Sequence, residues 1–261
     1  MEFVQINKIC IHYKWIDNKK EKTFLFINSL GTDYRIWDKV VEPLQEYGNI
    51  LLFDKRGHGL SDTARETKGL EDFTEDVWLL LNHLEIKSCI VIGLSVGGII
   101  AQLLAHYHPA MVEKLILCDT RHKIGFTDLW NNRINQIKSH GLKSIADDVI
   151  KRWFPPFFHA GHPVIVEGCK NMLVRCDLKG YVQTCEAIRD ADTTGIAKQI
   201  KKPVLCVVGS EDKSTTVEEV KALADLIEDS GFEIIEGSGH IPCVDNPEAL
   251  SKLIIEFIKY G

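Results

Sequence analysis

Short runs of apolar residues recur along the chain, and segments with apolar positions at helical spacing lie between them. Several runs are rich in β-branched and aliphatic residues with little polar alternation, which is typical of strands covered on both faces. We predict strands at residues 23–28, 50–54, 88–93, 114–119, 204–209 and 232–236. Strands that alternate with helices build βαβ units, so the pattern predicts an α/β fold with a mostly parallel central sheet and helices on both faces.

Two segments show the clearest helical pattern. Apolar residues recur at intervals of three and four from Leu70 to Leu84, and again from Leu250 to Ile258. This spacing places them on one face of a helix that packs against a core. We therefore predict a core helix in each segment.

The stretch at residues 123–199 differs from the rest of the chain. It carries helical patterns, a break at Pro155–Pro156 and no convincing strand, and it lies between the fourth and fifth predicted strands. A helical insertion at this point would cover the carboxyl ends of the strands, where open α/β sheets bind ligands. We predict a core made of residues 1–122 and 200–261, with residues 123–199 inserted as a helical lid.

Composition and charge narrow the class of protein. The chain has 261 residues, of which 45% are hydrophobic and 26% charged, as expected for one large globular domain with an insertion. A net charge of −6 and a pI near 5.9 argue against a general binder of nucleic acid or membrane surfaces. No stretch of about 18 apolar residues occurs, so no membrane-spanning helix is predicted.

The N-terminal sequence and the cysteines point to a cytoplasmic protein. Residues 1–15 lack a basic head followed by an apolar core, so no signal peptide is predicted. The eight cysteines include no C-x-x-C pair, and Cys89, Cys118 and Cys206 lie within apolar runs. Small buried side chains are therefore favoured over disulfides or a metal site, which fits a reducing compartment.

A serine flanked by glycines follows the predicted strand at 88–93. The motif is G-x-S-x-G with Ser95 at its centre, and a helical pattern begins directly after it. The bare motif arises by chance in roughly one in ten chains of this length, but its place between a strand and a helix removes most chance matches. Such a turn lifts the serine hydroxyl above the sheet. Ser95 is the predicted nucleophile, and a structural serine in a tight turn is the alternative.

A serine hydroxyl needs a base to take its proton at neutral pH. In strand–turn–helix sites of this kind the acid and the base follow the serine in chain order, each after a later strand. The loop after 204–209 carries Glu211 and Asp212, and the loop after 232–236 carries His240 in a glycine-rich sequence. We predict His240 as the base and Asp212 as the acid that orients its imidazole, with Glu211 as the alternative acid.

Two backbone N–H groups must face the negative charge that develops on an attacked carbonyl oxygen. Val96, directly after the nucleophile, is one predicted donor, and Leu30, in the loop after 23–28, is the other. Residues 54–61 also form a glycine-rich loop after a strand, but they lack the phosphate-loop pattern G-x-x-x-x-G-K-[ST]. The two glycines around His58 are predicted to form a turn.

Several motifs together resemble one known family. They are N-S-L-G-T at 28–32, D-x-R-G-H-G-x-S at 54–61, G-L-S-x-G-G at 93–98, W-N-x-R-I at 130–134, R-W-F at 152–154, C-E-A-I-R-D-A-D at 185–192 and G-H-I-P at 239–242. Across nearly its whole length the chain resembles the 3-oxoadipate enol-lactonases of the α/β-hydrolase superfamily, which open an enol-lactone in bacterial breakdown of aromatic compounds. The segments within 130–192 are the more specific ones.

The resemblance implies an α/β-hydrolase fold and a set of site residues. It implies Ser95, Asp212 and His240 as the triad, Leu30 and Val96 as oxyanion donors, and Trp130 and Arg133 as lid residues that contact the substrate. The substrate so implied carries a free carboxylate, and an acidic protein needs a local cation to hold it. Arg133 could grip it through two hydrogen bonds. Arg189 is the second candidate cation, although its neighbours Asp190 and Asp192 favour a structural ion pair.

The predicted activity is hydrolysis of a small carboxylate-bearing lactone, with no metal or organic cofactor. A general carboxylesterase, a perhydrolase and a carbon–carbon bond hydrolase of the same fold remain alternatives. A haloalkane dehalogenase would need an aspartate in place of Ser95. A catalytically inactive binding module of the same fold is the alternative from a different class. The predicted partner is a small molecule, without nucleic acid or membrane, and the oligomeric state stays open.

Overall fold

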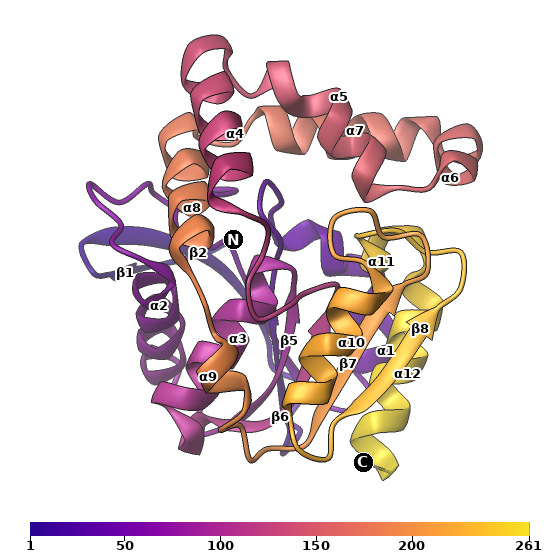
Figure 1. Cartoon of the computed structure of the whole chain (residues 1–261). Helices are drawn as coiled ribbons and strands as arrows, with labels where there is room; N and C mark the ends of the chain where they lie inside the picture. Colours follow the sequence, from indigo (N-terminus) through magenta and orange to yellow (C-terminus); the bar gives the residue numbers. More distant parts are fainter. Residues whose placement is uncertain (261) are drawn as a thin grey trace.

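The computed structural model describes residues 1–260 and has one mixed sheet at its centre (Figure 1). The strands are β1 (Glu2–Ile6), β2 (Ile9–Ile16), β3 (Thr23–Ile27), β4 (Asn49–Phe53), β5 (Cys89–Leu94), β6 (Val112–Cys118), β7 (Val204–Gly209) and β8 (Gly231–Ile235). Their spatial order is β1-β2-β4-β3-β5-β6-β7-β8. All neighbours from β4 to β8 in this order pair in parallel, whereas the pairs β1–β2 and β2–β4 are antiparallel.

The helices lie between and after these strands. Those of the core are α1 (Asp38–Leu44), α2 (Leu70–His83), α3 (Val96–Tyr107), α10 (Val217–Leu226), α11 (Pro242–Asp245) and α12 (Pro247–Tyr260), with 3₁₀ turns η1 (Tyr34–Trp37) and η2 (Pro109–Met111). Those between β6 and β7 are α4 (Thr127–His140), α5 (Lys143–Trp153), α6 (Pro156–Gly161), α7 (Pro163–Val174), α8 (Leu178–Asp190) and α9 (Thr194–Ala197). We call α4–α9 the helical insertion. Within residues 1–260, no helix combines the length and apolar character needed to cross a bilayer.

The predicted α/β fold with a mostly parallel sheet is confirmed. Each of the six predicted strands is present, with ends displaced by at most two residues. Strands β3, β4, β5 and β7 are buried along their whole length, because helices cover both faces of the sheet. On these faces α2 packs with α3, and α1 packs with α12 (Figure 1).

The N-terminal hairpin of β1 and β2 was not predicted. In β1 the residues alternate between more and less exposed, and β2 is interrupted by His12 and Lys14 and is less buried towards its end, so neither shows the apolar run of a central strand. The two-residue turn between them is Asn7-Lys8, with φ of 49° and 65°. Such a turn usually contains glycine, because L-residues rarely adopt positive φ. The usual hairpin signal is therefore missing from the sequence.

The helical insertion stands over the end of the sheet where β5 reaches Ser95 (Figure 1). One close approach of the insertion to the core is a contact between two glycines. Gly57, at φ +71°, lies in the turn around His58, and Gly180 lies in α8. A Cβ on Gly180 would be 2.4 Å from the Cα of Gly57. The turn predicted around His58 thus serves as the surface on which α8 rests.

This contact makes a testable prediction for Gly180→Ala. Alanine normally favours a helix over glycine by roughly 0.5–1 kcal/mol. Here we expect the opposite sign, a loss of about 1–3 kcal/mol, because the new methyl group overlaps backbone that cannot move aside. Gly168→Ala in α7 is the matched control, since its Cβ would meet nothing within 4 Å. Urea unfolding of both variants measures the difference. A stabilised Gly180→Ala would contradict the close contact.

Candidate active site

Ser95 occupies a strained turn between β5 and α3. Its φ of 56° and ψ of −118° are rare for an L-residue, and such a conformation costs about 1–3 kcal/mol. The flanking glycines allow it. A Cβ on Gly93 would lie 2.4 Å from the carbonyl oxygen of Gly97, and one on Gly97 would lie 2.1 Å from that of Ile27. The G-x-S-x-G motif therefore exists because strand and helix approach too closely here for any side chain.

The end of β6 holds this turn in place. The Ser95 amide donates to the carbonyl oxygen of Cys118 at 2.9 Å, and the Thr120 hydroxyl donates to the carbonyl oxygen of Ser95 at 2.6 Å. Ser95 is itself 7% exposed. Both of its backbone polar groups are thus fixed from the neighbouring strand, and only the side chain is left to react.

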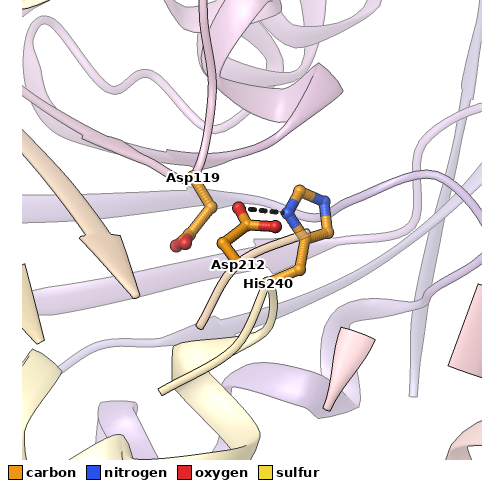
Figure 2. A group of neighbouring side chains, drawn as sticks. All are labelled: Asp119, Asp212 and His240. Atoms are coloured by element: carbon orange, nitrogen blue, oxygen red, sulfur yellow. Dashed lines mark hydrogen bonds and ion pairs between the residues drawn. The ribbon is translucent and has the colours of Figure 1, made fainter. Parts of the chain in front are cut away.

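Asp212 and His240 meet in the loops after β7 and β8. His240 Nδ1 and Asp212 Oδ2 are 2.8 Å apart, and both side chains are buried (Figure 2). The Asp212 carboxylate also accepts from the Ser214 amide at 2.7 Å, the Thr215 amide at 3.2 Å and the Thr215 hydroxyl at 2.6 Å. Glu211, the alternative acid, is exposed and has no side-chain contact with His240. The geometry therefore favours Asp212.

The loop of His240 is tied to the helical insertion. The His240 amide donates to the carbonyl oxygen of Trp153 at 2.8 Å, at the end of α5. On the core side, the Gly239 amide donates to Asp245 at 2.7 Å, and the Ser238 hydroxyl donates to the same carboxyl. Burial raises the pKa of Asp245 to about 6. The position of the imidazole thus depends on both parts of the fold.

A cavity of about 300 Å³ brings the predicted residues together. Ser95, His240 and Leu30 line it from the core, and Trp130 and Arg133 line it from α4. Further apolar walls come from the insertion, namely Ile124, Leu129, Val149, Trp153, Tyr181 and Ile188. The volume suits a small organic molecule.

The amides of Leu30 and Val96, the predicted oxyanion donors, are not engaged elsewhere in the described part of the fold. Leu30 lies in the loop after β3, and Val96 is the first residue of α3. Among residues 1–260 neither amide N–H has a hydrogen-bond acceptor, so both are free to donate. Lys55 holds the loop of Leu30 in place, because its buried ammonium donates to the carbonyl oxygen of Ser29. Burial lowers the pKa of Lys55 to about 7.

Two of the predicted lid residues lie against each other. Trp130 is buried, and its indole N–H donates to the carbonyl oxygen of Ile124 at 2.7 Å. The guanidinium of Arg133 lies 5.0 Å from the centroid of the Trp130 ring, a cation–π contact. Arg189 does not line the cavity; it pairs with Asp190 at 2.8 Å and donates to Asn131 at 2.9 Å. Arg189 is thus already held by other side chains.

Arg152 is a site residue that the sequence reasoning missed. It lines the cavity from α5, and burial together with the nearby charge of Arg133 lowers its pKa. Within residues 1–260, neither Arg133 nor Arg152 forms an ion pair, whereas Arg121 in the same wall is paired with Glu219. The R-W-F motif at 152–154 carried the resemblance, but nothing in the sequence showed that its arginine faces the cavity.

Asp119 is the second residue that was missed. It directly follows β6, and its carboxyl lies beside Asp212 and His240, with one side-chain atom of each within 4.8 Å of the others (Figure 2). Such a trio could in principle hold a metal ion. Here, however, Nδ1 of His240 and both oxygens of Asp212 are already engaged in hydrogen bonds. The arrangement fits a row of hydrogen-bonded groups better than a metal centre.

The fold and the geometry around Ser95 define the class of this protein. The chain belongs to the alpha/beta hydrolase fold family, whose model matches residues 22–162. The predictions of an α/β-hydrolase fold and of an enzyme of the hydrolase class are thereby confirmed.

Within that family the chain is similar to enol-lactonases. It is 32% identical to 3-oxoadipate enol-lactonase 2 of Acinetobacter baylyi over 96% of this chain and 94% of that protein. It is 29% identical to 3-oxoadipate enol-lactonase 1 of the same organism over 95% and 98%. The solved enol-lactonase structure from Burkholderia xenovorans superposes with a TM-score of 0.96 at 30% identity, covering 99% of this chain and 100% of that one. The resemblance drawn from the sequence motifs is confirmed.

Replacing Ser95 with alanine tests the nucleophile. We expect Ser95→Ala to lower kcat by about 10⁴ or more, because the hydroxyl of the predicted nucleophile is removed. The thermal midpoint should fall little, since only a hydroxyl is removed. Labelling with a fluorophosphonate provides an independent measurement, with reaction in the parent protein and none in the variant. A variant that keeps a tenth of the activity would leave Ser95 a structural role only.

A pair of substitutions tests the acid. Asp212→Asn should lower kcat by roughly 10⁴, as in the comparable serine-protease change, because asparagine favours the wrong imidazole tautomer and carries no charge. Glu211→Gln is the matched control on the adjacent residue, and we expect little change because that side chain is exposed. Steady-state kinetics on one ester substrate suffice. The reverse ranking would assign the acid to Glu211.

Proposed function

We propose that this protein is a serine hydrolase that opens a small carboxylate-bearing enol-lactone, converting 3-oxoadipate enol-lactone to 3-oxoadipate through an acyl-enzyme on Ser95. The observation that carries this proposal is the cavity itself. It joins Ser95 and His240 to two guanidinium groups, Arg133 and Arg152, that have no acidic partner within residues 1–260. The enol-lactonase relatives support the same substrate class.

The first half of the reaction acylates the serine. His240 takes the proton of the Ser95 hydroxyl, and Oγ attacks the lactone carbonyl carbon. Asp212, bonded to Nδ1, orients the ring and compensates the charge of the imidazolium that forms. The amides of Leu30 and Val96 donate to the negatively charged oxygen. The tetrahedral intermediate then collapses, the bond to the ring oxygen breaks, and His240 returns its proton to that oxygen, which leaves as an enol.

The second half releases the product. His240 takes a proton from water, and the hydroxide oxygen attacks the acyl carbon. Collapse of this second intermediate breaks the bond to Ser95 Oγ, which regains its proton from His240. The product leaves with a new carboxylate, and its enol tautomerises to the ketone. The protein contributes a base, an orienting carboxylate and two amide donors, and the lactone brings its own leaving group tethered by the ring.

The two arginines hold the carboxylate of the substrate. The guanidinium of Arg133 is held over Trp130, which limits the orientations open to it. Arg152 comes from α5, the next helix, and burial together with the charge of Arg133 lowers the pKa of Arg152. An anion bound between them relieves this repulsion and accepts charge-assisted hydrogen bonds from both. The helical insertion would therefore act as a lid that recognises the acid group of the substrate.

The alternative functions make different demands on the groups that line the cavity. A general carboxylesterase has no use for two unpaired cations in its substrate cavity. A catalytically inactive binding module would not need a bonded His240–Asp212 pair at the same cavity as Ser95. The carboxylate-bearing lactone gives a role to Ser95, His240 and both arginines, and for this reason it is preferred.

Removing either cation tests the substrate class. Arg133→Met and Arg152→Met keep bulk and helix propensity but lose the charge. For each we expect a loss of about 1.5–3 kcal/mol in kcat/KM on the acidic lactone, because a hydrogen bond between charged groups is gone. A neutral p-nitrophenyl ester should be hydrolysed almost as before. The ratio of the two rates is the measurement, since it cancels general damage to the insertion.

Arg189→Met is the matched control, because Arg189 is engaged outside the cavity. It should change both rates alike. Equal losses on both substrates in Arg133→Met and Arg152→Met would show that these arginines only hold the insertion together. No loss on either substrate would remove the basis for a carboxylate-bearing substrate.

A further inference from the structure

Asp119 is a buried acid with no role in the mechanism above. It has no exposed surface, and its backbone adopts φ of +45° directly after β6. One carboxyl oxygen, Oδ1, accepts from the Gly209 amide at 2.9 Å. The other, Oδ2, is buried and accepts no hydrogen bond from any donor of the described residues, although the Asp212 side chain is its neighbour. A buried carboxyl with an unpaired oxygen is costly unless that oxygen carries a proton that it can donate.

The groups around Asp119 offer it no positive charge. Asp212 lies between Asp119 and His240 (Figure 2). Asp245, from α11, adds a second negative influence, and the nearby thiols of Cys118 and Cys243 are buried, which raises their pKa. Within residues 1–260 no lysine or arginine forms an ion pair with Asp119. Burial, and after it the charge of Asp212, raises the pKa of Asp119 well above its usual range.

The two neighbouring carboxyls are not equivalent. Asp212 receives four donated hydrogen bonds, from the amides of Ser214 and Thr215, the hydroxyl of Thr215 and the ring of His240. Asp119 receives one, from Gly209. Two buried carboxyls this close cannot both ionise cheaply, and the one with more donors keeps the charge. The proton therefore belongs to Asp119.

We propose that Asp119 is a positioning residue that is a neutral carboxylic acid at neutral pH and donates its O–H to the carboxylate of Asp212, forming a row Asp119–Asp212–His240. The row holds Asp212 from the side opposite the imidazole. It stabilises the Asp212 charge without adding a second negative charge beside His240. The catalytic part of this proposal rests on the proposed roles of Asp212 and His240. The protonation state of Asp119 can be tested without any substrate.

The first experiment measures stability against pH in the parent protein and in Asp119→Asn. In the unfolded chain Asp119 is ionised above about pH 4. If the folded protein keeps it neutral, folding takes up one proton, and stability falls as pH rises until Asp119 ionises in the folded state. From about pH 6 to pH 8 the unfolding equilibrium constant of the parent should then rise more steeply with pH than that of Asp119→Asn. The ratio of the two constants should grow by a factor of up to about ten per pH unit. Equal slopes across this range would overturn the proposal.

Asp245→Asn is the matched control for this slope. Asp245 is also a buried acid beside the same loop, but its pKa of about 6 means that it ionises near the lower edge of the window. Its removal should therefore change the slope mainly below about pH 6. An Asp245→Asn protein with the same slope change as Asp119→Asn from pH 6 to pH 8 would show that the proton is not on Asp119.

The second experiment separates a hydrogen-bonding role from packing. With p-nitrophenyl acetate, Asp119→Asn should keep kcat/KM and the pH of its acid limb, because an amide can still donate to Asp212 and accept from Gly209. Asp119→Leu should lose about tenfold or more, the effect of removing a hydrogen bond to a charged group. An acid limb displaced to lower pH in Asp119→Asn would mean that an ionised Asp119 had been acting on His240, which overturns the proposal. If Ser95 proves not to be catalytic, the stability experiment still decides where the proton lies.

Discussion

The strained turn at Ser95 is the constraint on which the rest of the site depends. A non-glycine residue at φ of 56° and ψ of −118° is stable only where its surroundings leave it no alternative. Here β5 and α3 meet at contact distances that only glycine permits, and Cys118 and Thr120, at and just after the end of β6, bind both backbone groups of Ser95. The proposed nucleophile is therefore positioned by the parallel sheet itself. The proposed acid and base follow the ends of β7 and β8.

Charge is distributed around this turn in two layers. Behind the imidazole lie three acids, Asp212, Asp119 and Asp245. In front of it, across the cavity, lie the guanidinium groups of Arg133 and Arg152. A protein with a net charge of −6 thus presents to its cavity two guanidinium groups that form no ion pair within residues 1–260, and the one acid that these residues place in the cavity wall, Glu219, is paired with Arg121. This arrangement would favour binding of the proposed anionic substrate with its acid group away from Asp212.

The sequence predicted what local patterning encodes and missed what only packing decides. Ser95, Asp212 and His240 were predicted because each follows a strand whose apolar run is unmistakable. The hairpin of β1 and β2 was missed because its strands are half exposed and its turn lacks glycine. Arg152 resembles any arginine on an amphipathic helix, and Asp119 resembles any polar residue that ends a strand. Arg152 lines the cavity and Asp119 lies beside Asp212 only through residues that are distant in the chain.

The helical insertion contributes more than a wall to the cavity. Its Trp153 carbonyl accepts from the amide of His240, so it holds the loop of the base. Its Leu173, in α7, lies where a Cβ on Gly31 would come within 2.5 Å, directly against the loop of Leu30, the proposed oxyanion donor. A change in how α5 sits would move the loop of the proposed base together with Arg152, one of the two arginines proposed to bind the substrate. Substrate choice and catalytic geometry would therefore be coupled, because α5 contributes to both.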